Sequence, residues 1–173
     1  MKQIFFFVTL FIATNSFSQD GRRVSVFLSF QANTTLYDRT ASNNSGGVGL
    51  GLQTTLNTKT FVRPTLEING NIFGGTKELY LTADGKPIYG KSGVLSIHGG
   101  PFIQLSDRFF FAATVGSHFY NDDVHFSARP SVGVYPTKGR KWTLKTSFTN
   151  VFQRDEISKE SFGYLSFAIA LKL

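Results

Sequence analysis

The three histidines are the side chains of this sequence best suited to acid–base or metal chemistry. If the short run at 106–108 is a tight turn between two strands, His98 and His118 would be opposite or diagonal neighbours across it. Zinc takes three or four ligands, and no acidic residue lies near this pair. We therefore expect no bound metal, and two polar side chains hydrogen-bonded to Ser96, Thr114 or water.

A lipid-hydrolysing site would need a serine, a histidine and an acidic partner on one face of a sheet. Ser117 and His118 are adjacent, so in a strand they point to opposite faces and cannot form a dyad. His125 follows Asp122 and Asp123, which could orient it as a general base. Acids in a loop beside a histidine are usually exposed, so this group supports only an alternative function, that of a barrel enzyme modifying lipid A.

Other motifs for catalysis or cofactor binding are missing from the sequence. There is no cysteine, which excludes a thiolate nucleophile and a disulfide framework. The glycine-rich stretch at 46–52 alternates as a strand and lacks the helix that follows a phosphate-binding loop. We expect no cofactor, no enzymatic activity and, without basic runs interleaved with aromatic residues, no nucleic acid. The formal net charge of +7 favours contact with anionic surfaces such as lipopolysaccharide.

The first 18 residues have the pattern of an export signal. A positive residue precedes an apolar stretch at 4–13, and residues 16–18 form a small-x-small cleavage site before Gln19. Ten apolar residues are too few to cross a bilayer as a helix. The sequence therefore predicts a signal peptide at 1–18, followed by one domain at 19–173.

The last ten residues alternate strictly between two kinds of side chain. Leu165, Phe167, Ile169 and Leu171 are apolar, and the residues between them are small, polar or charged. An edge strand with one apolar face invites aggregation, whereas the closing strand of a membrane barrel turns that face to lipid. Eight such segments are predicted, at 23–33, 46–56, 60–73, 93–105, 109–120, 124–136, 141–152 and 164–173.

The connections between these segments differ in length according to their order. Every second connection is short, at 57–59, 106–108 and 137–140. The others are more variable and often longer, with loops at 34–45, 74–91 and 153–160. Short periplasmic turns and longer outside loops are typical of outer-membrane barrels.

The charged residues within the segments favour the same architecture, because by parity all of them fall on the inward face. A soluble sandwich would turn its charges outward. Taking 56 and 60 as the residues beside the first short turn places Gln53 opposite Arg63 and Gly49 opposite Glu67. The inward charged residues are Arg63, Glu67, Arg129, Lys145 and Lys172. We expect a structural network of polar side chains in the lumen, made of Gln53, Arg63, Glu67, His98, His118, Arg129 and Lys145.

Four prolines lie within predicted strands, although a closed barrel has no free edge to accommodate them. Pro64, Pro101 and Pro136 fall near strand ends, where pairing can lapse. Pro130 is in the middle of its segment, and a β-bulge is the expected accommodation there.

The segments 101–116, 129–150 and 164–173 (PFIQLSDRFFFAATVG, RPSVGVYPTKGRKWTLKTSFTN and YLSFAIALKL) resemble the small eight-stranded outer-membrane β-barrels related to the outer membrane protein A barrel. RPTLEI at 63–68 echoes RPSVGV at 129–134, as in a weak internal repeat of the hairpin plan. The resemblance covers essentially the whole exported chain and implies an all-β, antiparallel, up-and-down transmembrane barrel of eight strands. It does not specify an activity, because such barrels have very different roles.

One feature departs from that family. Its members usually end in an aromatic residue, which the barrel-assembly machinery reads, whereas this chain ends in Leu173. Assembly is expected to be less efficient for that reason.

We expect a non-enzymatic, monomeric protein of the bacterial outer membrane, with a structural or surface-interaction role carried by its outer loops. Its partners would be outer-membrane lipid and lipopolysaccharide, and the assembly machinery during biogenesis. An open pore is not expected, because eight strands leave a lumen that side chains fill. The alternatives are the lipid A-modifying enzyme and a secreted lipocalin-like barrel, which would need an apolar interior.

Overall fold

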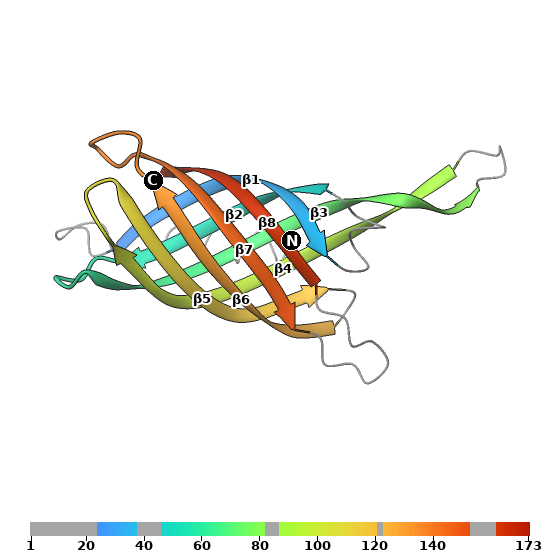
Figure 1. Ribbon diagram of the computed structural model, residues 1–173, viewed down its shortest axis with the longest axis horizontal. Coiled ribbons are helices and arrows are strands. Elements are labelled where there is room, and N and C mark those ends of the chain that lie inside the picture. The colour runs from blue at the N-terminus through green and yellow to red at the C-terminus, as the bar shows by residue number, and fades with distance from the viewer. Residues whose placement is uncertain (1–23, 38–45, 82–86, 121–122, 153–161) are drawn as a thin grey trace, which may run out of the picture.

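The computed structural model describes residues 24–37, 46–81, 87–120, 123–152 and 162–173. They form one antiparallel sheet closed into a barrel, in which each strand pairs with its neighbours in chain order and β8 pairs with β1 (Figure 1). The predicted eight-stranded up-and-down barrel is confirmed. The strands are β1 (Val24–Tyr37), β2 (Gly46–Leu56), β3 (Val62–Leu81), β4 (Pro87–Gln104), β5 (Phe109–Tyr120), β6 (Asp123–Val134), β7 (Trp142–Phe152) and β8 (Phe162–Lys172).

The barrel is apolar outside and polar inside, which is the reverse of a soluble protein. Leu50 and Ile169 are 61% and 54% exposed, whereas Arg129 is fully buried. This follows from strict alternation along strands whose second face carries serine, threonine, amide and charged side chains. The outward direction predicted for the apolar residues of the closing strand is confirmed. In the described part of the chain, no helix is long and apolar enough to cross a membrane.

The two ends of the barrel differ in their connections. The turns at 57–61, 105–108 and 135–141 lie at the end that holds Val24 and Leu173, which we call the turn end. The opposite end, the loop end, is where the chain continues into 38–45, 82–86, 121–122 and 153–161, all outside the described residues.

β3 and β4 continue past the rim at the loop end as a two-stranded ribbon, which projects from the barrel in Figure 1. Gly74 is the last β3 residue that pairs with β2, opposite Gly46, yet β3 remains paired with β4 as far as Leu81 opposite Pro87. The loop predicted at 74–91 is therefore wrong for most of its length. Register shifts on both sides of Glu78 accommodate the irregular sequence while the ladder continues.

The β2–β3 turn is longer than predicted, and this changes the register. Residues 57–61 form the connection, in which both Thr58 Oγ1 and Thr60 Oγ1 donate to the carbonyl of Val62. Gln53 consequently lies opposite Glu67, and Gly49 lies opposite Asn71. The predicted pairs of Gln53 with Arg63 and Gly49 with Glu67 are wrong, because threonine side chains stabilise a wider loop where a tight turn was assumed.

The prolines within the strands lie where pairing with one neighbouring strand ends or skips two residues. The register of the strands is the same on both sides of each skip. Pro64 and Pro101 lie opposite each other in the β3–β4 ladder. Pro64 lies just beyond the last β2–β3 pair, while the β4–β5 ladder skips Gly100 and Pro101. The β6–β7 ladder likewise skips Arg129 and Pro130 and resumes in register, so the bulge expected at Pro130 is wrong. Pro136 lies in the turn that follows β6.

Candidate functional site in the barrel lumen

The centre of the lumen holds one carboxylate between two cations. Lys145 Nζ donates to Glu67 Oε1 over 2.9 Å, and Arg129 Nε lies 3.5 Å from Glu67 Oε2. All three side chains are at most 5% exposed. Strands β3, β6 and β7 supply one charge each, so the ion pairs cross the lumen and connect opposite walls. The centre therefore carries one positive charge in excess.

Amide side chains extend this group of charges towards β1 and β2. Lys145 Nζ also donates to Gln53 Oε1 over 2.9 Å, and Arg129 Nη2 donates to Gln31 Oε1 over 2.9 Å. Gln31 Nε2 in turn donates to Asn69 Oδ1 over 2.6 Å. Neutral amide oxygens thus accept hydrogen bonds from both buried cations without adding charge, while Arg129 Nε makes only the ion contact with Glu67 Oε2.

The two inward histidines lie beside this network at different depths. His98 lies opposite Gly116 and His118 lies opposite Ser96, so the two are diagonal neighbours. His98 Nε2 is 2.7 Å from Ser127 Oγ, a partner on β6 that differs from the expected Ser96 and Thr114. Within the described residues, no cluster of three His, Cys, Asp or Glu side chains is present to bind a metal.

His118 lies nearer the loop end, against aromatic rings. Its ring centroid is 6.0 Å from those of both Phe162 and Tyr164. His125 lies directly opposite it in the β5–β6 ladder. The side chains of Asp122 and Asp123, the proposed partners of His125, fall outside what the structure describes.

Arg63 is not joined to the central network. Its side chain lies at the turn end with those of Arg140 and Lys172, around a cavity of about 210 Å³. No described residue pairs with the Arg63 guanidinium, and its buried Nε has no hydrogen-bond partner. Parity alone places Arg63 and Glu67 on the same face, but they are four positions apart along β3 and so lie at different depths in the barrel.

An aromatic layer separates the central network from the turn end. Phe102 stacks on Phe110 with ring centroids 4.7 Å apart, and Phe110 contacts Tyr135 at 5.2 Å. Burial raises the pKa of Tyr135 to about 12, although the cationic Arg140 and Arg63 oppose the rise. The buried residues of this layer, the turn-end cluster, are Phe27, Phe102, Phe110, Ala112, Tyr135 and Ala170.

A second apolar group lies on the loop-end side of the network. Phe73, Val94 and Tyr164 are buried there, and Phe162 packs against them. Phe73 meets Tyr164 edge to face at 5.3 Å. We call these four residues the loop-end cluster. Reasoning from polar residues missed both clusters, although parity places Phe27 and Phe73 inward.

The space left beside the central network is small. A cavity of about 10 Å³ lies between Lys145 and Gln53 on one side and the turn-end cluster on the other. That volume is at the lower limit for a single water molecule. With aromatic layers on both sides, this arrangement is suited to bracing the barrel wall.

The fold is that of known transmembrane barrels. The attachment invasion locus protein (Ail) of Yersinia pestis, solved in complex with the heparin analogue sucrose octasulfate, matches with a TM-score of 0.58 at 8% identity, over 87% of this chain and 97% of that one. The same protein in a phospholipid nanodisc gives 0.51 at 10% identity, over 86% and 99%. A de novo designed transmembrane β-barrel gives 0.52 at 8% identity, over 86% and 95%.

The sequence itself matches no protein-family model. It is also without a match among curated proteins. At 8–10% identity, the likeness to the solved structures establishes an eight-stranded transmembrane β-barrel and no activity.

Proposed function

We propose that this chain is a non-enzymatic β-barrel of the bacterial outer membrane, which acts as a structural support or through surface interactions. The observation that supports this proposal best is the inverted polarity of the wall. An apolar outer wall is suited to contact with lipid and not with water, while the ion pairs of Glu67 with Lys145 and Arg129 connect the strands inside. The proposal extends to the family suggested by the sequence, the small barrels related to outer membrane protein A.

Fractionation of cells combined with gel migration tests the location. The protein should be found with the outer membrane and should migrate faster when it is loaded unheated, because a folded barrel resists detergent. Release in soluble form without detergent would contradict a membrane location. In this setting we place the turn end in the periplasm and the loop end outside, since outer-membrane barrels have their short turns on the periplasmic side.

A closed lumen is part of this proposal. The turn-end and loop-end clusters support it, because their buried rings stand on both sides of the ion pairs. Purified protein in a planar lipid bilayer should give no steady ion current, whereas a stable current through the unmodified protein would contradict a closed lumen.

Surface interaction would be carried by the loop end. The chain as a whole is basic, which favours anionic partners such as lipopolysaccharide and sulfated polysaccharides. The connections at 38–45 and 153–161 hold three basic residues beside four acidic ones, so a contact at the loop end would use Arg39, Arg154 and Lys159 individually. The sucrose octasulfate complex of Ail suggests heparin as a first ligand to test. Shortening the connections at 38–45 and 153–161 should abolish retention on heparin while the heat-dependent gel shift remains, if this role is correct. Unchanged retention would leave the structural role as the proposal.

The two alternatives are weaker. A lipocalin needs an apolar interior for its ligand, and this interior is polar at its centre. For a lipid A-modifying enzyme the candidates remain His125 with Asp122 and Asp123. Release of lyso-lipid by the purified protein, lost in His125→Ala, would favour that enzyme over the proposal made here.

A further inference from the structure

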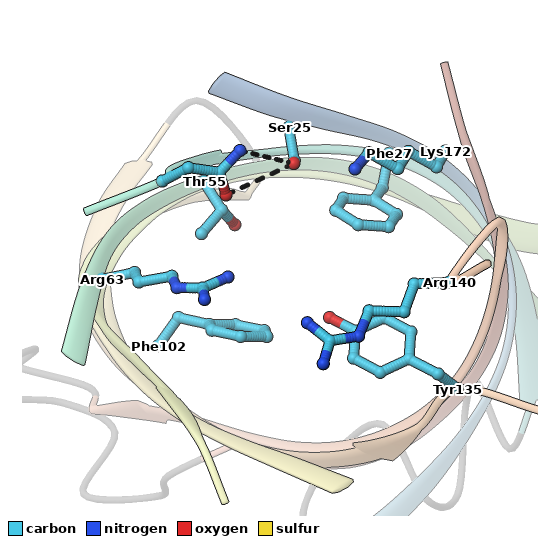
Figure 2. A pocket seen from close by; sticks show the side chains of 9 residues that line it. Ser25, Phe27, Thr55, Arg63, Phe102, Tyr135, Arg140 and Lys172 are labelled. Carbon is cyan, nitrogen blue, oxygen red and sulfur yellow. Dashed lines mark hydrogen bonds between the residues drawn. The ribbon is translucent and has the colours of Figure 1, made fainter. Parts of the chain in front are cut away.

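The turn end contains a concave, positively charged site outside the central network. Its cavity of about 210 Å³ is lined by Ser25, Phe27, Thr55, Asn57, Arg63, Phe102, Tyr135, Arg140 and Lys172. Three of these residues are cationic and none is acidic. Figure 2 shows Arg63 and Arg140 pointing into the same space from opposite walls, with the Tyr135 hydroxyl near Arg140. We call this space the turn-end cavity.

Arg63 shows that this cavity differs from a barrel rim on which every charged group is hydrated. Its Nε is buried without a hydrogen-bond partner, while its side chain as a whole is partly exposed. A buried donor left without an acceptor is costly, and more so when it is charged. An acceptor brought into the cavity beside Arg63 Nε would satisfy this donor, and an anionic acceptor would compensate most.

Arg140 keeps its charge available to the same space. Its Nη2 donates to Asp107 Oδ1 over 2.8 Å, but the Asp107 side chain is fully exposed. Exposed ion pairs of this kind are weak, so Asp107 neutralises the cavity very little. The Arg140 guanidinium also lies 5.6 Å from the centre of the Tyr135 ring, which holds it against the inner wall.

The floor of the cavity is closed by the turn-end cluster, since Phe27, Phe102 and Tyr135 belong to both. At about 30 Å³ for each water molecule in the liquid, the cavity has room for several waters or for one phosphate group. A ligand would enter from the turn end and stop at the aromatic rings. The site is therefore suited to binding and not to passage.

We propose that the turn-end cavity binds a phosphate group, free or carried on a small ester or a lipid headgroup. Guanidinium groups match phosphate oxygens with paired hydrogen bonds, and two of them from opposite walls suit an anion with more than one charged oxygen. The Tyr135 hydroxyl supplies a further donor. This inference does not depend on the role of the loop end, because a barrel of any function would present the same cavity.

The test is a titration of the intact barrel with inorganic phosphate, in micelles of a detergent that contains no phosphate and at constant ionic strength maintained with chloride. The nitrogen resonance of Arg63 Nε, observed by NMR, should shift and saturate. In Arg63→Gln, the dissociation constant read from the neighbouring Tyr135 ring signals should rise about tenfold or more, as expected for a lost charge-assisted hydrogen bond.

Lys138→Gln is the matched control, because it removes a cation from the 135–141 turn that does not line the cavity. It should leave the dissociation constant unchanged. Retention of the heat-dependent gel shift in Arg63→Gln confirms that this variant folds, and folding is expected because Arg63 has no ion pair to lose among the described residues.

A second arm separates the two sources of phosphate. Without free phosphate, the barrel is placed in nanodiscs of phosphatidylcholine mixed with phosphatidylglycerol, and its Arg63 signal is compared with that in micelles of a detergent that contains no phosphate. A shift of the Arg63 signal in the mixed nanodiscs assigns the site to a lipid headgroup, and a shift only on addition of inorganic phosphate assigns it to a soluble anion. Absence of a shift in both arms, or an equal effect of Lys138→Gln and Arg63→Gln, would overturn the proposal.

Discussion

Glu67 and Lys145 are 78 positions apart in the sequence and meet across the lumen, where the lysine ammonium donates to Glu67 Oε1 over 2.9 Å. Arg129 lies beside the other oxygen of the same carboxylate. Glu67→Gln would leave two buried cations without a counter-charge, so we predict that the free energy of unfolding falls by about 3–5 kcal/mol. Urea unfolding from lipid vesicles, followed by the fluorescence of the single tryptophan Trp142, measures this change.

A double-mutant cycle supplies the control for this pair. Lys145→Gln alone should also destabilise, but the double variant should lose at least about 1 kcal/mol less than the two single losses added together, because both members of the contact are then gone. Asp107→Asn removes the exposed partner of Arg140 and should leave unfolding unchanged. Additive losses in the cycle would mean that Glu67 and Lys145 do not interact in the membrane.

Because the outer surface is apolar, we predict that a charged residue placed on it destabilises this barrel, whereas a soluble protein would tolerate the same change. Leu50 is 61% exposed near the middle of β2, where a soluble barrel would accept arginine readily. In a bilayer this position faces hydrocarbon, so Leu50→Arg should reduce the free energy of unfolding by about 2–4 kcal/mol. The same vesicle unfolding experiment measures the loss.

Phe61→Arg is the matched variant. Phe61 is 69% exposed but lies in the 57–61 turn, beyond the end of the strands. Arginine there should cost about 0–1 kcal/mol. Equal losses at the two positions would argue against a lipid-facing β2.

The alternation of side chains predicted the strand number, the closure and the outward face, because a period of two is a local property of the chain. The β2–β3 register was not accessible in the same way. It depends on Thr58 and Thr60 donating to the Val62 carbonyl, and a pattern of apolar residues does not contain that information. A shift by an even number of residues leaves every side chain on its predicted face, so parity stayed correct while the partner of Gln53 changed.

Depth along the barrel was the other property that parity did not provide. Parity placed Arg63 and Glu67 on one face of β3. Two residues four positions apart along a strand are separated by more than the length of a hydrogen bond, so their side chains reach different depths of the lumen. Arg63 therefore reaches the turn-end cavity, and Glu67 reaches Lys145. The aromatic clusters were missed for a different reason: Phe27 was not expected among polar inward residues, although it lies two positions from Ser25 and from Ser29.

Gly116 allows close approach of β4 and β5, and this predicts a large effect from one methyl group. A Cβ at Gly116 would overlap the carbonyl oxygen of Ile97 and lie 2.8 Å from His98 Cα. These are backbone atoms, which cannot move aside as a flexible side chain does. Gly116→Ala should therefore destabilise the barrel by about 1–3 kcal/mol in the vesicle unfolding experiment.

Gly70→Ala tests whether that loss is steric. Gly70 lies within β3, and an added Cβ there meets no atom within 4 Å. Alanine should leave stability unchanged or raise it by up to about 1 kcal/mol, since it restricts the unfolded chain. A comparable loss at Gly70 would point to a general effect of replacing glycine and would contradict close packing at Gly116.

The burial of the Tyr135 side chain leads us to predict a change at high pH. Its pKa is raised to about 12, while an exposed tyrosine in the unfolded chain titrates near 10. Because the folded pKa is the higher one, the contribution of Tyr135 to stability is complete below about pH 10 and is lost as the pH rises through 12. The near-ultraviolet absorbance of the protein minus that of Tyr135→Phe should titrate near 12, and the stability advantage over that variant should fall in the same window. A difference curve centred near 10 would mean that the Tyr135 hydroxyl faces water in the folded protein.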